Sequence, residues 1–123
     1  MSREKPNPAV WSPSIDIPDS ECNIFQIWSR YYNQIQKFRN FSERTIYEYT
    51  STLAQINNGV VRDMLVVRMT EWDIWTAVTS AQCKGNGKPY SSSAIMKRFS
   101  VFHDIFLYLQ TRAVCADPMS IPP

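Results

Sequence analysis

The chain of 123 residues has the length of a single domain, and its 44% hydrophobic and 13% aromatic content is enough for a core, which excludes general disorder. No uncharged apolar stretch reaches the roughly 20 residues of a membrane helix, and the N-terminus lacks the apolar run of a signal peptide, so a cytoplasmic protein is expected. The net charge of +2 is unevenly spread, because residues 84–112 contain five basic side chains and one acidic one. This basic segment favours an anionic partner such as a nucleic-acid backbone, with a solvated helix face as the alternative.

The first 19 residues contain four of the eight prolines. Each proline ring fixes φ and removes a backbone donor, so this segment is expected to be an extended arm rather than a helix. An arm of this kind should be removable with little loss of stability, because few backbone hydrogen bonds depend on it.

Two amphipathic helices are predicted next. Ser20 is the expected N-cap of a helix over about 21–39, whose apolar residues recur at three- and four-residue steps: Ile24, Trp28, Tyr31, Ile35 and Phe38. Ser42 is the expected N-cap of a second helix, and the sequence Asn57-Asn58-Gly59 is expected to supply the left-handed residue that ends it. The second helix has an apolar face of Ile46, Tyr49, Leu53 and Ile56 and an opposite face of Arg44, Glu48, Ser51 and Gln55.

The stretch VVRDMLVVRM that follows fits either a brief helix or an extended strap. Thr70 and Asp73 then have the spacing of a capping box at the start of a third helix, about 71–82. This helix is expected to bury Trp72 or Trp75 together with Ile74 and Val78. The glycines in CKGNGKP predict a flexible basic loop after it.

Ser91 is the expected N-cap of the last helix, about 92–112. Its apolar stripe consists of Ile95, Phe99, Phe102, Phe106 and Leu109, and at 100° per residue the opposite face carries Ser93, Lys97, Ser100 and Asp104. Together the predicted elements indicate an all-α fold, a compact bundle of four to five helices without an internal repeat.

Few residues could support catalysis or metal binding. Cys22, Cys83 and Cys115 are odd in number, lack Cys-x-x-Cys spacing and have one histidine to join them, which favours free thiols over disulfides or a zinc site. His103 is the one candidate general base, but consecutive helical residues diverge by about 100°, so Asp104 cannot readily orient it. No metal, cofactor or enzymatic activity is therefore expected.

Binding of phosphate is better supported, because the N-terminus of a helix offers free N–H groups to anions. The second helix begins SERT, and the fourth begins YSSS between flanking lysines. Helix capping accounts for Ser42 and Ser91, whereas Arg44, Ser93 and Lys97 have no capping role. The candidate DNA-binding residues are Arg44, Thr45, Lys84, Lys88, Tyr90, Ser92, Ser93 and Lys97.

Three stretches resemble the core-binding domain of tyrosine recombinases of the phage-integrase type. FSERTIYEYTSTL is similar to its Ser-x-x-Thr-x-x-x-Tyr-x-x-x-Leu opening, VVRMTEWDIWTAV to its next element, and RFSVFHDIFLYLQTRAVCADP to its closing helix and turn. The resemblance covers about residues 20–118. Ala113 and Asp117 stand where the family usually has Gly and Asn, and both residues are compatible with a turn.

The resemblance implies a SAM-like helical domain, residues 20–118, that packs against one side of double-stranded DNA. A separate catalytic domain, which supplies the nucleophilic tyrosine, would follow a linker that begins at residues 119–123. None of the tyrosines here is then the nucleophile, and Tyr49 matches a position that packs the core. The expected partners are DNA, that catalytic domain and, on DNA, neighbouring protomers.

Two other functions are compatible with the sequence. A helical protein–protein interaction domain would use surplus aromatic residues such as Trp11, Trp28, Tyr32 or Tyr108. A small hydrolase would use His103. Salt-sensitive binding to duplex DNA distinguishes the recombinase module from the interaction domain.

Overall fold

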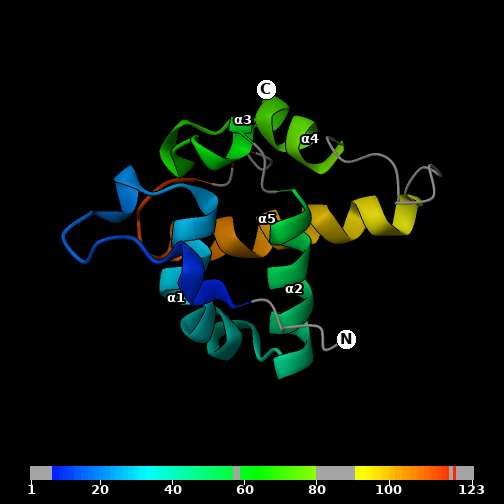
Figure 1. The fold of residues 1–123 in the computed structure, drawn as a ribbon, viewed down its shortest axis with the longest axis horizontal. Coiled ribbons are helices and arrows are strands. Elements are labelled where there is room, and N and C mark those ends of the chain that lie inside the picture. The colour runs from blue at the N-terminus through cyan, green and yellow to red at the C-terminus, as the bar shows by residue number, and fades with distance from the viewer. Residues whose placement is uncertain (1–6, 57–58, 80–90, 117, 119–123) are drawn as a thin grey trace.

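Helices form almost all of the regular structure in the computed structural model, which describes residues 7–56, 59–79, 91–116 and 118. The α-helices are α1 (Ile24–Arg39), α2 (Glu43–Gln55), α3 (Gly59–Arg62), α4 (Glu71–Thr79) and α5 (Ser92–Thr111), and the 3₁₀ helices are η1 (Pro8–Trp11), η2 (Asp19–Glu21) and η3 (Val66–Arg68). Within the described ranges the only β-type pairing is an isolated bridge between Asn23 and Leu65. The prediction of an all-α bundle is confirmed (Figure 1).

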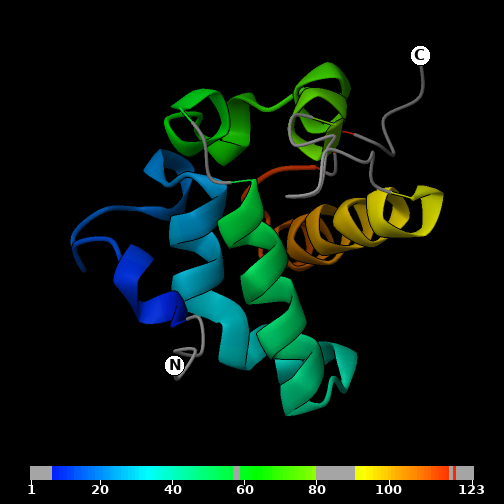
Figure 2. The ribbon, with the colours of Figure 1, turned by 45° about the vertical axis from the view of Figure 1, so that its right-hand side comes forward.

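The helix α5 is the centre of the bundle. It contacts α1, α2 and α4, and Figures 1 and 2 show it running between the α1–α2 pair and the layer formed by α3 and α4. Phe102, Phe106 and Leu109 are buried as predicted, whereas Ile95 and Phe99 near the start of the helix are only partly buried. The buried surface is wider than one stripe, because α5 also buries Arg98, Val101, Asp104, Ile105 and Tyr108.

Asp104 is the residue of α5 whose environment was predicted incorrectly. The helical wheel places it on the face opposite the apolar stripe, yet only 4% of its surface is exposed. Because α5 contacts three other helices, its buried surface extends beyond the apolar stripe and includes Asp104, and a buried acidic residue requires partners. The Tyr49 hydroxyl and the Arg39 guanidinium are those partners.

The start of α1 differs from the prediction by three residues. The N-cap is Asn23 and not Ser20: the Gln26 N–H donates to Asn23 Oδ1 (2.8 Å), and the Asn23 N–H donates to Gln26 Oε1 (2.9 Å). This reciprocal pair satisfies two amide donors that the helix leaves free. Ser20 lies instead in η2. Most of the predicted apolar residues of α1 are buried, but Phe38 is exposed.

The helix α2 follows the predicted pattern closely at its start and along its length. The Thr45 N–H donates to Ser42 Oγ (3.2 Å), so Ser42 is the N-cap, and the four predicted apolar residues are all buried. The helix ends at Gln55 with Ile56 as its C-cap. Of the three residues of the predicted stop, Gly59 begins α3, and Asn57 and Asn58 lie outside the described residues.

The segment after α2 combines both predicted alternatives. The short helix α3 leads into an extended stretch, in which Leu65 pairs with Asn23 and the Val66 N–H donates to the Cys22 carbonyl (2.9 Å), and η3 follows. The Thr70–Asp73 capping box then starts α4 as predicted, with the Thr70 N–H donating to Asp73 Oδ2 (2.8 Å).

The tryptophans of α4 do not enter the core. Trp72 is 76% exposed and Trp75 is 44% exposed, so the expectation that one of them is buried is wrong. Ile74, Ala77 and Val78, at helical spacing, form the buried face instead. Small and aliphatic side chains allow α4 to approach α5 closely, and the two indoles therefore lie on the outside. Residues 80–82 of the predicted helix and the loop after it are outside the described residues.

The described part of the N-terminal arm is folded onto α1 and is not extended. Pro8 begins η1, where a missing N–H costs nothing. The Trp11 ring lies 5.3 Å from that of Phe25, and the hydroxyls of Ser12 and Ser29 are hydrogen-bonded at 2.7 Å. Asp19 binds Arg30 (2.8 Å) and accepts a hydrogen bond from Tyr31 (2.5 Å). The prediction of a dispensable arm therefore conflicts with the contacts that it makes.

Candidate nucleic-acid interface

Two of the predicted DNA-binding cations meet on one surface. Arg44 in the first turn of α2 and Lys97 in the second turn of α5 are far apart in the sequence. Arg44 Nε lies 3.3 Å from one carboxylate oxygen of Glu48, and Lys97 Nζ lies 3.2 Å from the other. Glu48 therefore joins Arg44 of α2 and Lys97 of α5 into one polar surface. We call this surface, with the exposed serines that precede Lys97, the α2–α5 face and define it by Arg44, Glu48, Ser92, Ser93 and Lys97.

The hydroxyl residues at the two helix starts have different roles. Ser91 caps α5, since the Ala94 N–H donates to its Oγ (3.3 Å). Ser92 and Ser93 follow it in the first turn and are exposed, so their hydroxyls are accessible from solvent. Thr45 is partly buried, and its hydroxyl lies 3.1 Å from Ser42 Oγ, which makes it part of the α2 cap. Lys84, Lys88 and Tyr90 lie outside the described residues.

A groove runs between α2 and α5 beside the paired charges. Its volume is about 370 Å³, and α2 and α5 line opposite sides of it with the side chains of Tyr47, Glu48, Ser51, Thr52, Gln55, Ser91, Ala94, Lys97 and Arg98. The residues on the α2 side of the lining are mostly polar and offer hydrogen-bonding groups to a ligand.

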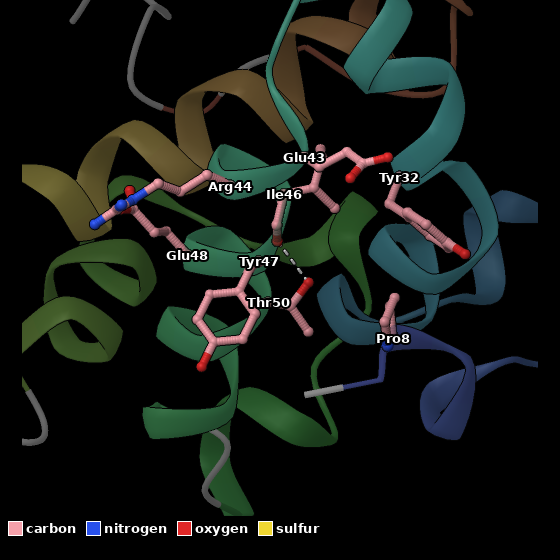
Figure 3. Close-up of a pocket in the computed structure, with 8 residues that line it drawn as sticks. All are labelled: Pro8, Tyr32, Glu43, Arg44, Ile46, Tyr47, Glu48 and Thr50. Carbon is pink, nitrogen blue, oxygen red and sulfur yellow. Dashed lines mark hydrogen bonds and ion pairs between the residues drawn. The ribbon is translucent and has the colours of Figure 1, made fainter. Parts of the chain in front are cut away.

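A second hollow of about 570 Å³ lies on the other side of α2, toward α1 and η1. Figure 3 shows Arg44 and Glu48 on one side of this hollow, Tyr32 and Pro8 on the other, and Tyr47 between them. Tyr47 is 44% exposed, and it lines both the groove and the hollow. The outer side of α2 is therefore a ridge between two depressions. The sequence did not single out Tyr47, although its helical spacing from Arg44 places it on the same side.

The charge of the α2–α5 face is smaller than the sequence suggests. Hydrogen bonds from Lys97 and then Arg44 hold the pKa of the Glu48 carboxyl below its ordinary range, so the carboxylate stays ionised and offsets part of their charge. Arg98 does not add to the face, because it is buried and its guanidinium donates to the Val78 carbonyl (2.8 Å). Arg112 lies against the Tyr31 ring and Asp19. The described basic residues of the segment 84–112 therefore do not form one positively charged surface.

The geometry gives no support to catalysis by His103. His103 is exposed on α5, whereas Asp104 is turned into the core toward Tyr49 and Arg39. Ser100, three residues before His103 in the sequence, donates its hydroxyl hydrogen to the Met96 carbonyl (3.2 Å).

Metal-binding and membrane-spanning features are also absent from the described residues. They contain no group of three or more His, Cys, Asp and Glu side chains arranged to share a metal ion. Cys22 is buried and Cys115 is partly buried, and Cys83 is outside the described residues. None of the helices in the described ranges is both long enough and apolar enough to cross a bilayer.

Comparisons of the chain with protein-family models, with curated proteins and with solved structures found no match. Function therefore has to be argued from the residues and their geometry.

Proposed function

We propose that the chain is a DNA-binding module of a site-specific tyrosine recombinase, and that the α2–α5 face contacts the phosphate backbone of duplex DNA. The observation that carries this proposal is the convergence of Arg44 and Lys97, from two helices, on one carboxylate. Lys97 and Ser91 of α5 line one groove with Glu48 of α2, and Arg44 pairs with the same carboxylate, so two cations and the N-terminus of α5 are available there to phosphate oxygens.

The conformation at the end of α5 supports the family resemblance. Ala113 has φ of 59°, and it is the residue that stands where the recombinase family usually has Gly. The Val114 N–H donates to the Leu109 carbonyl (3.0 Å) and the Ala113 N–H to that of Gln110 (3.0 Å), which is the Schellman pattern that favours glycine. The backbone at Ala113 therefore has the left-handed conformation that glycine adopts without strain, which agrees with the glycine that the family usually has there.

In this function the chain binds DNA and performs no chemistry. Cleavage and joining would belong to a catalytic domain of the same full-length protein, and neighbouring protomers on DNA would be further partners. We place this activity in the cytoplasm, where the DNA of a phage or bacterial element is accessible. Binding by the module alone is expected to be non-specific in strength, with Kd of roughly 10⁻⁴ to 10⁻⁶ M at physiological salt.

Titration of a fluorescently labelled duplex at several salt concentrations tests the proposal. Arg44→Glu and Lys97→Glu should each weaken binding and reduce its salt dependence, because each removes a phosphate contact that releases counterions. Arg68→Glu is the matched control: Arg68 is exposed in η3, and the variant has the same change in charge. Equal affinities for the wild type and all three variants would exclude the α2–α5 face as a DNA interface.

A protein-interaction module is the second candidate, and the exposure of Trp72 favours it. The aromatic residues first considered for this role are less suitable: Trp28 and Tyr108 are buried, and Trp11 and Tyr32 are partly buried against α1 residues. Absence of salt-sensitive binding to DNA by the wild type would shift the assignment to this function.

A further inference from the structure

The outer side of α4 presents the largest exposed aromatic groups of the described chain. A surface pocket of about 670 Å³ is lined by Glu71, Trp72, Trp75, Thr76 and Thr79, which we call the tryptophan face. Figures 1 and 2 show α4 in the layer formed with α3, at the opposite side of the molecule from the α1–α2 connection. Two exposed indoles that line one surface pocket are a candidate interaction site, because such large apolar groups seldom lie together on a solvated surface.

The tryptophan face is partly preorganised. The Trp75 ring packs edge-on against Phe99 of α5, with ring centroids 4.5 Å apart and an interplanar angle of 74°. Trp75 is thus fixed by the bundle while almost half of its surface remains open. A rigid, half-exposed indole loses little conformational entropy on binding, which is why tryptophan is common among the residues that dominate interface energies.

The polar groups of the tryptophan face restrict the chemistry of a ligand. The Thr76 hydroxyl donates to the Trp72 carbonyl (2.9 Å) and the Thr79 hydroxyl to the Trp75 carbonyl (2.7 Å), so both hydrogens are already used within the helix. The side chain of Glu71 has no hydrogen bond or ion pair with another described residue, whereas that of Asp73 is engaged by Thr70. The Glu71 carboxylate is therefore the polar group of the tryptophan face that can bind a ligand, and it lies beside two indoles.

The acidic residues of α4 favour a positively charged partner. The helix contains Glu71 and Asp73 and no basic residue, so a phosphate backbone would be repelled here. A cationic side chain would gain both an ion pair with Glu71 and a cation–π contact with an indole. We propose that the tryptophan face binds a peptide segment of a partner protein in which arginine or lysine alternates with large apolar side chains. This site is independent of the α2–α5 face, which has the opposite preference for charge.

The test uses an end-capped eight-residue peptide of alternating leucine and arginine, and the same peptide with glutamate in place of arginine. Binding is measured by calorimetry and by the NMR signals of the four indole N–H groups, with those of Trp72 and Trp75 assigned from Trp72→Phe and Trp75→Phe. The arginine peptide should shift these two signals and bind about tenfold more tightly than the glutamate peptide, which corresponds to one cation–π contact together with one ion pair.

Variants distinguish specific binding at the tryptophan face from non-specific binding elsewhere on the protein. Trp72→Ala should abolish binding of the arginine peptide without loss of fold, since Trp72 is exposed, and Glu71→Gln should reduce the preference for arginine several-fold. Tyr47→Ala is the matched control, because Tyr47 is as exposed as Trp75 but lies on α2, and its variant should bind like the wild type. Equal binding of both peptides, or shifts confined to other indoles, would overturn the proposal. Sedimentation that shows Trp72-dependent dimerisation would also overturn it, since a second copy of the chain would then be the occupant.

Discussion

Tyr49 on α2 donates a hydrogen bond of 2.5 Å to Asp104 Oδ2 on α5, while Arg39 at the end of α1 lies 3.1 Å from Asp104 Oδ1. One buried carboxylate therefore connects three helices. Burial of Tyr49, together with the hydrogen bond to Asp104, raises the pKa of its hydroxyl well above the ordinary value, so it remains a donor across the physiological range.

Replacing Tyr49 should lower the free energy of unfolding. Tyr49→Phe leaves a buried carboxylate oxygen without its donor, and we expect a loss of about 1–3 kcal/mol in the free energy of unfolding. Urea denaturation followed by circular dichroism measures this change. Tyr47→Phe removes a hydroxyl from an exposed tyrosine on the same helix and should have almost no effect. Equal stabilities of the two variants would show that the hydrogen bond does not contribute to the fold.

Stability should fall in acid partly through Asp19. Burial alone would raise the pKa of this carboxyl, but the hydrogen bonds from Tyr31 and Arg30, with the charges of Arg30 and Arg112, lower it below the ordinary 3.8. Because the native state holds the proton less tightly than the unfolded state, the stabilisation is present above pH 3.8 and is lost as the pH falls through the native pKa. Asp19→Asn should lower stability at neutral pH and flatten the acid limb of the profile. Asp16→Asn, an exposed control, should leave both unchanged.

The left-handed residue after α5 provides a stabilising substitution. A non-glycine residue in this region costs about 1–2 kcal/mol, and Ala113 has φ of 59°. Ala113→Gly relieves that strain but increases the freedom of the unfolded chain, so a net gain of about 0.5–1 kcal/mol is expected. Ala54→Gly, an exposed change within α2, should be destabilising. Thermal unfolding distinguishes the two directions, and a loss of stability in Ala113→Gly would contradict the assigned backbone conformation.

Neutralising Glu48 should strengthen DNA binding if the α2–α5 face is the interface. Phosphate must compete with this carboxylate for Arg44 and Lys97, so Glu48→Gln should raise affinity several-fold and steepen the dependence on salt. Glu21→Gln has the same change in charge at an exposed position of η2 and serves as the control. If the two variants bind duplex DNA equally well, the gain reflects net charge alone.

The helices could be predicted from the sequence wherever capping and periodicity agree. Ser42, Ser91 and the Thr70–Asp73 pair mark three helix starts correctly, because the side chain that caps a helix lies within three residues of the amide that it accepts from. Ser20 is the predicted N-cap of α1 and Asn23 the actual one, although Gln26 stands three residues after Asn23 and completes a capping box. Both residues have suitable side chains, and the choice depends on the contacts that η2 makes with the rest of the fold.

The errors in burial share a cause that periodicity cannot detect. A helical wheel assigns one buried face, but α5 packs against α1, α2 and α4, so Asp104 and Arg98 are buried despite their charge. The converse applies to α4, which has few neighbours, and its large indoles remain outside. Likewise, the arm is fixed by tertiary contacts such as Trp11 with Phe25, which its proline content does not indicate.

For the candidate site, the sequence predicted Arg44 and Lys97 separately but not their common carboxylate. Helical spacing relates Arg44 to Glu48 within α2, whereas the approach of Lys97 depends on how α2 crosses α5. One of the two tryptophans of α4 is expected in the core because large aromatic residues usually enter it, yet both are exposed.

The central position of α5 has a consequence for the order in which the protein is made. The ribosome releases the arm and α1 to α4 first, and three of these helices, α1, α2 and α4, pack on a helix that is synthesised after them. Until Phe102, Phe106 and Leu109 have left the ribosome, the apolar faces of α1, α2 and α4 lack their shared partner. Folding of this domain is therefore expected to occur late in translation, and a nascent chain stalled before Ser91 should be bound by chaperones rather than fold by itself.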